Sequence, residues 1–199
     1  MQVRELTVPG AWELTPKQHS DSRGMFFEWF TDRAFTGFAG HRFDLQQANC
    51  SVSAAGVLRG LHFAELPPSQ AKYVTCVAGA VFDVIVDIRV GSPTFGRWDA
   101  VLLEGDNRHS VYLSEGLGHG FLALEDNSTV MYLCSTGYDP QREHTIYADD
   151  PVLGIEWPLP SSERVLSERD AAAPTLTEVR EAGLLPSWEA THAYIDRLR

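Results

Sequence analysis

Alternating apolar and polar positions dominate the middle of the chain. In Val81–Val90 every even position is apolar, whereas the odd positions include Asp83 and Asp87. A period of two predicts a β-strand with one buried face and one partly polar face. Tyr73–Val77 precedes this run across Ala78-Gly79, a short turn that predicts an antiparallel hairpin between the two segments.

Further short apolar runs follow, separated by turn-rich pieces and without intervening helical periods. They are Trp98–Leu103, Ser110–Leu113, Gly120–Leu124 and Thr129–Ser135. Many short strands at this spacing predict an antiparallel sandwich or barrel. Helical signals come late in the chain, at Thr175–Ala182 and Trp188–Leu198. The sequence therefore predicts an all-β fold with short C-terminal helices.

Composition and charge narrow the class of protein. The 199 residues, 44% hydrophobic and 22% charged, fit one globular domain (1–199), with a helical extension over about 165–199. A net charge of −11 argues against nucleic-acid and membrane partners. Three cysteines without metal or redox spacing, and no apolar stretch of ~18 residues, predict a cytoplasmic protein.

Arg59 and His62 are the first candidates for chemistry. They are three residues apart, so a regular strand would direct them to opposite faces. Gly60 lies between them, and a bulge there would turn both into one pocket. The alternative is an arginine at the rim and a histidine hydrogen-bonded in the core, which this stretch alone slightly favours.

Four other side chains carry similar alternatives. Lys72, one of two lysines, would hold an oxyanion or a phosphate, or be a solvated strand-end residue. His119 lies among three glycines, where a hydrogen-bonded turn histidine is the ordinary interpretation. Tyr132 is either a packed aromatic or a proton donor. Asp170 alone is indistinguishable from a solvated carboxylate.

Several chemistries lack their motifs in this sequence. There is no His-x-His pair, nucleophile elbow, dinucleotide fingerprint or lysine-bearing phosphate loop, so we expect neither a metal nor a cofactor. A histidine, a lysine, a tyrosine and an aspartate instead suit proton abstraction beside a carbonyl. A base takes the proton, a cation steadies the enolate, and an acid returns the proton elsewhere.

A series of motifs then resembles one known family. The stretches are Asp21-Ser22-Arg23-Gly24, Gln47-Ala48-Asn49, Gly56-Val57-Leu58-Arg59-Gly60-Leu61-His62, Gln70-Ala71-Lys72, Gly118-His119-Gly120-Phe121, Gly154-Ile155-Glu156-Trp157-Pro158 and Leu166-Ser167-Glu168-Arg169-Asp170. In this order and spacing they resemble the dTDP-4-dehydrorhamnose 3,5-epimerases and their antibiotic-sugar relatives, over residues 8 to 186. The resemblance implies a metal-free, cupin-type antiparallel β-barrel (jelly roll).

The resemblance also implies roles for matched residues. His62 would be the general base, oriented by Asp170, while Lys72 would stabilise the enolate and Tyr132 would protonate the opposite face. The dTDP-sugar would be bound by Arg23, Glu28, Gln47, Asn49, Arg59, His119 and Tyr138. Family members are homodimers, so the N-terminal segment 1–45 would contribute to the dimer and carry Arg23 and Glu28 to the partner's site.

Some positions depart from the family pattern. Leu133 follows Tyr132 where lysine is common, Cys50 stands where histidine is usual, Phe63-Ala64 replaces Tyr-Gln, and His19 occupies an often aromatic position. These departures favour epimerisation of dTDP-4-dehydro-6-deoxy-D-glucose at C-3 alone, in deoxysugar or antibiotic biosynthesis. Double 3,5-epimerisation, C-5 epimerisation, ketoisomerisation and a non-enzymatic nucleotide-sugar-binding cupin are the alternatives.

Overall fold

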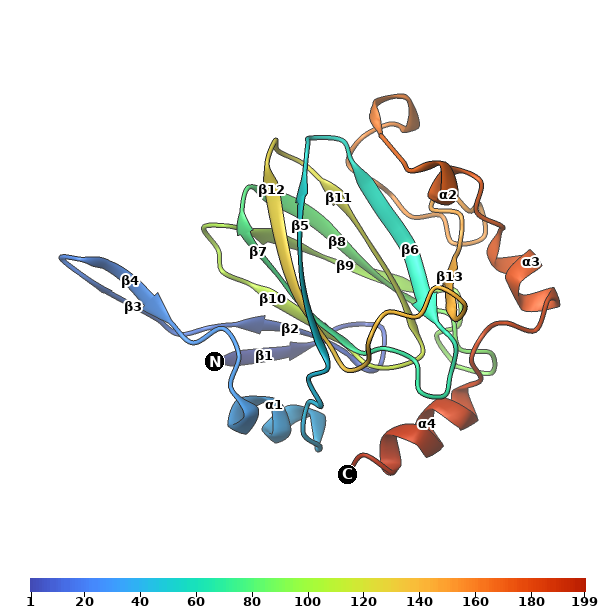
Figure 1. Ribbon diagram of the computed structural model, residues 1–199, viewed down its shortest axis with the longest axis horizontal. Helices are drawn as coiled ribbons and strands as arrows, with labels where there is room; N and C mark the ends of the chain where they lie inside the picture. The colour runs from blue at the N-terminus through green and yellow to red at the C-terminus, as the bar shows by residue number, and fades with distance from the viewer.

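The computed structural model describes residues 1–199, and most of the chain forms two antiparallel sheets (Figure 1). The six-stranded sheet has the order β1 (Gln2–Glu5), β2 (Ala11–Thr15), β10 (Ser110–Leu113), β7 (Lys72–Ala78), β12 (Ser128–Cys134) and β5 (Gln47–Ser53). The five-stranded sheet has the order β13 (Glu143–Thr145), β6 (Leu58–Ala64), β11 (Leu117–Ala123), β8 (Ala80–Asp87) and β9 (Trp98–Glu104). The expected antiparallel all-β architecture is confirmed.

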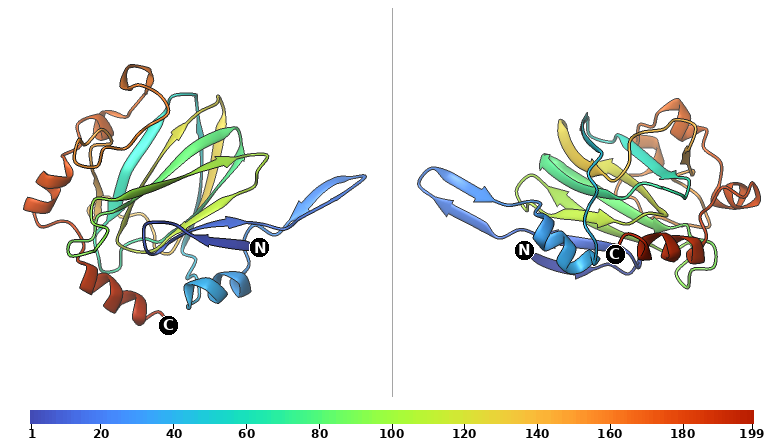
Figure 2. Two further views of the ribbon diagram at one scale, coloured as in Figure 1. Left: turned by 180° about the vertical axis from the view of Figure 1, so that it is seen from behind. Right: turned by 60° about the horizontal axis from the view of Figure 1, so that its bottom comes forward.

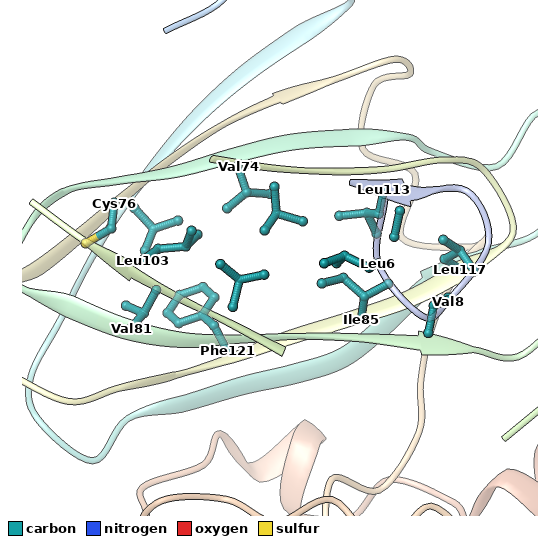
Figure 3. Packing of buried hydrophobic residues seen from close by; sticks show 14 of the residues in the cluster. Leu6, Val8, Val74, Cys76, Val81, Ile85, Leu103, Leu113, Leu117 and Phe121 are labelled. Carbon is teal, nitrogen blue, oxygen red and sulfur yellow. The ribbon is translucent and has the colours of Figure 1, made fainter. Parts of the chain in front are cut away.

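The main hydrophobic core lies between the two sheets, where alternate residues of each strand point inward (Figure 3). Val74 and Val111 come from the six-stranded sheet, and Val81, Ile85 and Phe121 from the five-stranded sheet. All five are at most 5% exposed. At ~25 cal/mol per Å² of apolar surface, this shared layer is the main force holding the sheets together.

The predicted hairpin across Ala78-Gly79 is wrong, because β7 and β8 belong to different sheets. Gly79 has a φ of +72°, and a Cβ there would lie 2.8 Å from the Ser128 Cα, so the chain turns from one sheet to the other in a space that suits glycine. The predicted polar face of β8 is also buried, since Asp83 and Asp87 are both 0% exposed. Polar residues alternate in β8 because they pair inside the protein.

Helices cover part of the outer face of each sheet. Helix α1 (Asp32–Ala39), which the sequence did not predict, places Phe35 against Tyr73 and Tyr112 on the six-stranded sheet. Helix α3 (Leu176–Glu181) packs on the outer side of the five-stranded sheet. Thr175 caps it in a reciprocal capping box.

The two C-terminal helices expected from the sequence are present as α3 and α4 (Trp188–Asp196), and the one-turn helix α2 (Glu168–Ala171) precedes them. A 3₁₀ turn occupies Ser161–Glu163. None of the helices is both long enough and apolar enough to cross a bilayer.

A two-stranded hairpin, β3 (Gln18–Asp21) with β4 (Gly24–Phe27), stands apart from the sheets. It extends away from the body in every view (Figures 1 and 2). Met25 and Phe26 are 47% and 67% exposed on it. The hairpin therefore has little core of its own within this chain.

Candidate active site

A bulge in β6 brings Arg59 and His62 to one cavity. Where β6 pairs with β11, two residues of β6 lie opposite Gly120 and the register shifts. Gly60 has a φ of +131°, and a Cβ there would lie 2.6 Å from the Gly120 Cα. Arg59 and His62 consequently both line a cavity of about 300 Å³ between the sheets. Of the two arrangements that the sequence left open, the structure has the bulged one.

His62 is paired with a buried carboxylate. Its Nε2 lies 2.9 Å from Oδ1 of Asp170, which is 4% exposed. Asp170 comes from α2, where the Ser167 hydroxyl caps the helix by accepting from the Asp170 backbone N–H at 3.1 Å. Because an ionised carboxylate is an acceptor, Nε2 carries the proton and Nδ1 is left as the basic nitrogen.

The electrostatics of Asp170 suit this pairing. Burial disfavours the charged form, but the hydrogen bond and the charge of His62 outweigh it, so the pKa of the Asp170 carboxyl is lowered. The carboxylate therefore stays ionised at neutral pH and can stabilise an imidazolium.

Lys72 and Tyr132 line the same cavity from the six-stranded sheet, at the start of β7 and in β12. His62 belongs to the five-stranded sheet. Since the two sheets face each other, the imidazole and the phenol approach the cavity from opposite sides. This placement is what an inversion at a flat carbon requires.

Tyr132 is held in its protonated form. Burial raises the pKa of its hydroxyl, and the nearby Cys134 and Glu143 act in the same direction. The charge of Arg59 and the neighbouring Asn49 amide oppose the shift without cancelling it. A phenol in this setting carries a proton to donate at neutral pH.

His119 lies on β11 directly across from His62 and also lines the cavity. Its Nε2 is 3.0 and 2.9 Å from the two carboxylate oxygens of Asp83. The residue is a strand histidine, 7% exposed, and the ordinary interpretation as a turn histidine is wrong. No sequence signal identified Asp83 as its partner, because the two residues are on different strands.

Gln47, Asn49 and Tyr138 form a connected group beside the cavity. Asn49 on β5 lies directly opposite Tyr132 on β12. The Asn49 Oδ1 accepts from Gln47 Nε2 at 2.8 Å, and the Gln47 Oε1 accepts from the Tyr138 backbone N–H at 2.9 Å. The three residues that the resemblance assigned to substrate binding are thus brought together.

Arg23 and Glu28 are not brought to this cavity. Arg23 lies in the β3–β4 hairpin, with its side chain 87% exposed and ion-paired to Asp21 at 2.6 Å. Glu28 follows β4 on the same projecting segment and contributes to a different surface hollow.

Sequence reasoning missed several residues of the cavity wall, among them Ser51, Ser167 and Arg169. Arg169 donates to the Glu143 carbonyl at 2.8 Å, which ties α2 to β13. A serine three residues before Asp170 is an N-cap signature, and it was the available signal for Ser167. No group of three or more His, Cys, Asp or Glu side chains is arranged to hold a metal ion.

Known proteins resemble this chain along its whole length. The family model described as dTDP-4-dehydrorhamnose 3,5-epimerase matches residues 5–178. A dTDP-4-dehydrorhamnose 3,5-epimerase from Mycobacterium tuberculosis is 67% identical over 200 residues, covering 100% of this chain and 99% of its own. A solved epimerase structure from the same species has a TM-score of 0.98 at 67% identity, with 100% of both chains covered.

A more distant relative is a 3'-monoepimerase from Streptomyces bikiniensis, solved in complex with dTDP-quinovose. It has a TM-score of 0.94 and 48% identity, and 98% of each chain is covered. The fold is accordingly the cupin-type jelly roll. The chain is a dTDP-4-keto-6-deoxy-sugar epimerase, an isomerase, and it belongs to the dTDP-4-dehydrorhamnose 3,5-epimerase family.

Proposed function

We propose that the protein inverts both C-3 and C-5 of dTDP-4-dehydro-6-deoxy-D-glucose. The observation that carries this proposal is the placement of His62 and Tyr132 on opposite walls of one cavity, with Lys72 beside them. The relative at 67% identity is named a 3,5-epimerase, whereas the 3'-monoepimerase is 48% identical. Both comparisons favour double epimerisation over the C-3 reaction that the sequence alone favoured.

Three of the four departures that favoured a C-3 enzyme carry less weight in the structure. Neighbouring residues of a strand point to opposite faces. Leu133 packs with the cluster beneath α1, Cys50 is exposed, and Phe63 packs on the outer side of the five-stranded sheet. Three departures from the family pattern therefore lie next to cavity residues in sequence but point away from the cavity.

The proposed reaction begins with His62. Its Nδ1 removes the proton beside the C-4 carbonyl, and Asp170 stabilises the imidazolium through Nε2. The electron pair of the broken C–H bond forms an enolate, whose oxygen the Lys72 ammonium stabilises. Tyr132 then donates its proton to the opposite face of the same carbon. Once the His62 imidazolium has released its proton to solvent and the Tyr132 phenolate has regained one from water, repetition at the second carbon inverts both centres.

Substrate binding is proposed to need a second copy of the chain. Arg59 supplies a cation for the diphosphate within the cavity, but Arg23 lies on the projecting hairpin and Glu28 directly follows it. The exposed Met25 and Phe26 beside them give that hairpin an apolar surface to bury. A homodimer in which each hairpin reaches the partner's cavity accounts for both features.

The test is incubation with dTDP-4-dehydro-6-deoxy-D-glucose in deuterated water, followed by NMR of the sugar. We expect deuterium at both C-3 and C-5, with both configurations inverted. Deuterium at C-3 alone would restore the single-epimerase interpretation, and a carbonyl moved to C-3 would indicate a ketoisomerase. Ligand binding without any exchange would indicate a binding protein.

A further inference from the structure

A row of hydrogen bonds runs along β5, beside the strand that carries Tyr132. It starts at the Tyr138 backbone N–H, passes through Gln47 and Asn49, and ends where the Asn49 Nδ2 lies 3.7 Å from the Cys134 Sγ. Asn49 and Tyr132 are partners in the β5–β12 ladder, which places their side chains next to each other on the cavity side.

The direction of this row is fixed at its first member. A backbone N–H can only donate, so the Gln47 amide must turn its oxygen toward Tyr138 and its NH₂ toward Asn49. Asn49 must then accept with Oδ1, which leaves its NH₂ facing Cys134, on the strand where Tyr132 lies directly opposite Asn49. An amide flip at either residue would set two like groups against each other.

The row therefore ends in the N–H groups of Asn49 and not in its carbonyl oxygen. Cys134 is buried, and burial raises the pKa of its thiol to about 11, so its sulfur remains a neutral and weak acceptor. It occupies one of the two Asn49 N–H groups, and the second is available to the phenol oxygen. A phenol oxygen that accepts from this N–H cannot also donate its own O–H to it.

We propose that Gln47 and Asn49 are positioning residues that form a directional relay, set by the Tyr138 backbone N–H, which donates to the Tyr132 oxygen and leaves the phenol proton directed into the cavity. The inference rests on the proposed function, since it assigns Tyr132 the role of acid. It gives the two amides a task beyond contact with the substrate.

The relay acts both before and during the proton transfer. Before transfer it orients the O–H bond toward the enolate carbon. During transfer that O–H bond breaks, a C–H bond forms with the enolate electron pair, and the ketone is restored. The phenolate left behind accepts the Asn49 N–H bond and later regains a proton from water. The opposing effects of burial and of Asn49 on the pKa of Tyr132 agree with this arrangement.

Asn49→Asp is the sharpest variant, because it keeps the shape of the side chain and replaces the donating NH₂ with an acceptor. The enzyme is followed in deuterated water by two readouts, deuterium wash-in to recovered substrate and inversion to product. We expect inversion to fall about 10²-fold, the scale of a general acid, while wash-in persists. His62 still removes the proton and returns a deuteron to the same face.

Gln47→Glu tests the relay one step earlier and serves if Asn49→Asp does not fold. Its carboxylate still accepts from Tyr138 but repels the Asn49 oxygen, which forces the amide to flip. We expect the same selective loss of inversion. The matched control is Gln46→Glu, the same change at the adjacent, exposed residue that bonds to Asp44, and it should leave both readouts unchanged.

The outcomes distinguish failure of the relay from failure of the proposed function. If wild-type protein shows neither wash-in nor inversion, the proposed function fails. If wild-type protein is active but the Gln47 and Asn49 variants lose wash-in and inversion in equal measure, with a raised KM, the amides bind substrate and the relay is refuted. Unchanged inversion in a folded Asn49→Asp variant would refute it as well.

Discussion

The two walls of the cavity differ in how their polar groups are partnered. On the five-stranded sheet each histidine has a carboxylate, Asp170 for His62 and Asp83 for His119. On the six-stranded sheet Tyr132 lies near the Asn49 amide and the Cys134 thiol, packs against the apolar core, and shares the cavity with Lys72. One wall thus pairs each imidazole with a carboxylate, and the other has a phenol that keeps its proton.

This difference indicates which sheet accepts a proton and which sheet donates one. A carboxylate behind an imidazole stabilises its cationic form, so that wall accepts a proton. Burial around a phenol disfavours its anionic form, so that wall holds a proton until a strong base appears. The enolate between the walls is such a base. Substitution of the groups that partner the reacting residues, and not only of the reacting residues, should therefore alter the rates of exchange and inversion.

The largest effect is expected from the accepting wall. His62→Asn removes the base, so both deuterium wash-in and inversion should fall by about 10²–10⁴-fold. Steady-state rates and isotope exchange measure the loss. His192→Asn in α4, whose ring bonds to the Trp188 carbonyl on an exposed surface, is the control with the same substitution. Retained wash-in in His62→Asn would assign the base to another residue.

Removal of the cation comes next. Lys72→Met keeps the length of the side chain but leaves the enolate oxygen without its ammonium, so exchange and inversion should both fall by about 10²–10³-fold. Both steps depend on the enolate, so the ratio between them should stay constant. Lys17→Met, at the other lysine of the chain, should retain wild-type rates.

The donating wall is tested by Tyr132→Phe. Loss of the hydroxyl should reduce inversion by about 10²-fold while wash-in continues, since the base on the opposite wall is intact. The phenylalanine ring preserves the packing of Tyr132 against the core. Parallel loss of exchange and inversion would contradict the division of labour between the walls.

The smallest effect concerns stability. Asp170→Asn should lower the free energy of unfolding at neutral pH by about 1–2 kcal/mol, because a charge-assisted hydrogen bond to His62 is lost. The folded pKa of Asp170 lies below its ordinary value of 3.8. Its contribution is therefore present above that value and disappears as the pH falls through the lower, folded value.

Urea unfolding of wild type and variant at a series of pH values measures this difference. The two curves should be separated at neutral pH and converge in acid. A constant difference throughout would show that Asp170 stabilises the fold by its shape and not by its charge.

Strand periodicity predicted the strands well because it depends on residues close in sequence. The runs at Ser110–Leu113 and Thr129–Ser135 correspond to β10 and β12, and the bulge at Gly60 was a recognised alternative. The pairing of the strands with one another was harder to predict from the sequence. A turn at Gly79 is compatible with a hairpin or with a crossover between sheets, and only the contacts of the whole core decide between them.

The site was predicted to the extent that its motifs are local. His62 and Asp170 are separated by 108 positions, and the resemblance to a family was needed to connect them. The pair of His119 with Asp83 had no such guide. The departures at Cys50 and Leu133 carry little weight for a related reason, since neighbouring residues of a strand point to opposite faces.

The extra residue at Gly60 shifts the alternation of inward and outward side chains in β6 by one position. Upstream of it the odd-numbered Arg59 lines the cavity, and downstream the even-numbered His62 does. Flattening the bulge into a regular strand of the same length would put these two side chains on opposite faces, although every functional group would still be present in the sequence. Engineered variants of this enzyme can change the residues on either side of the bulge, but the bulge itself has to be kept.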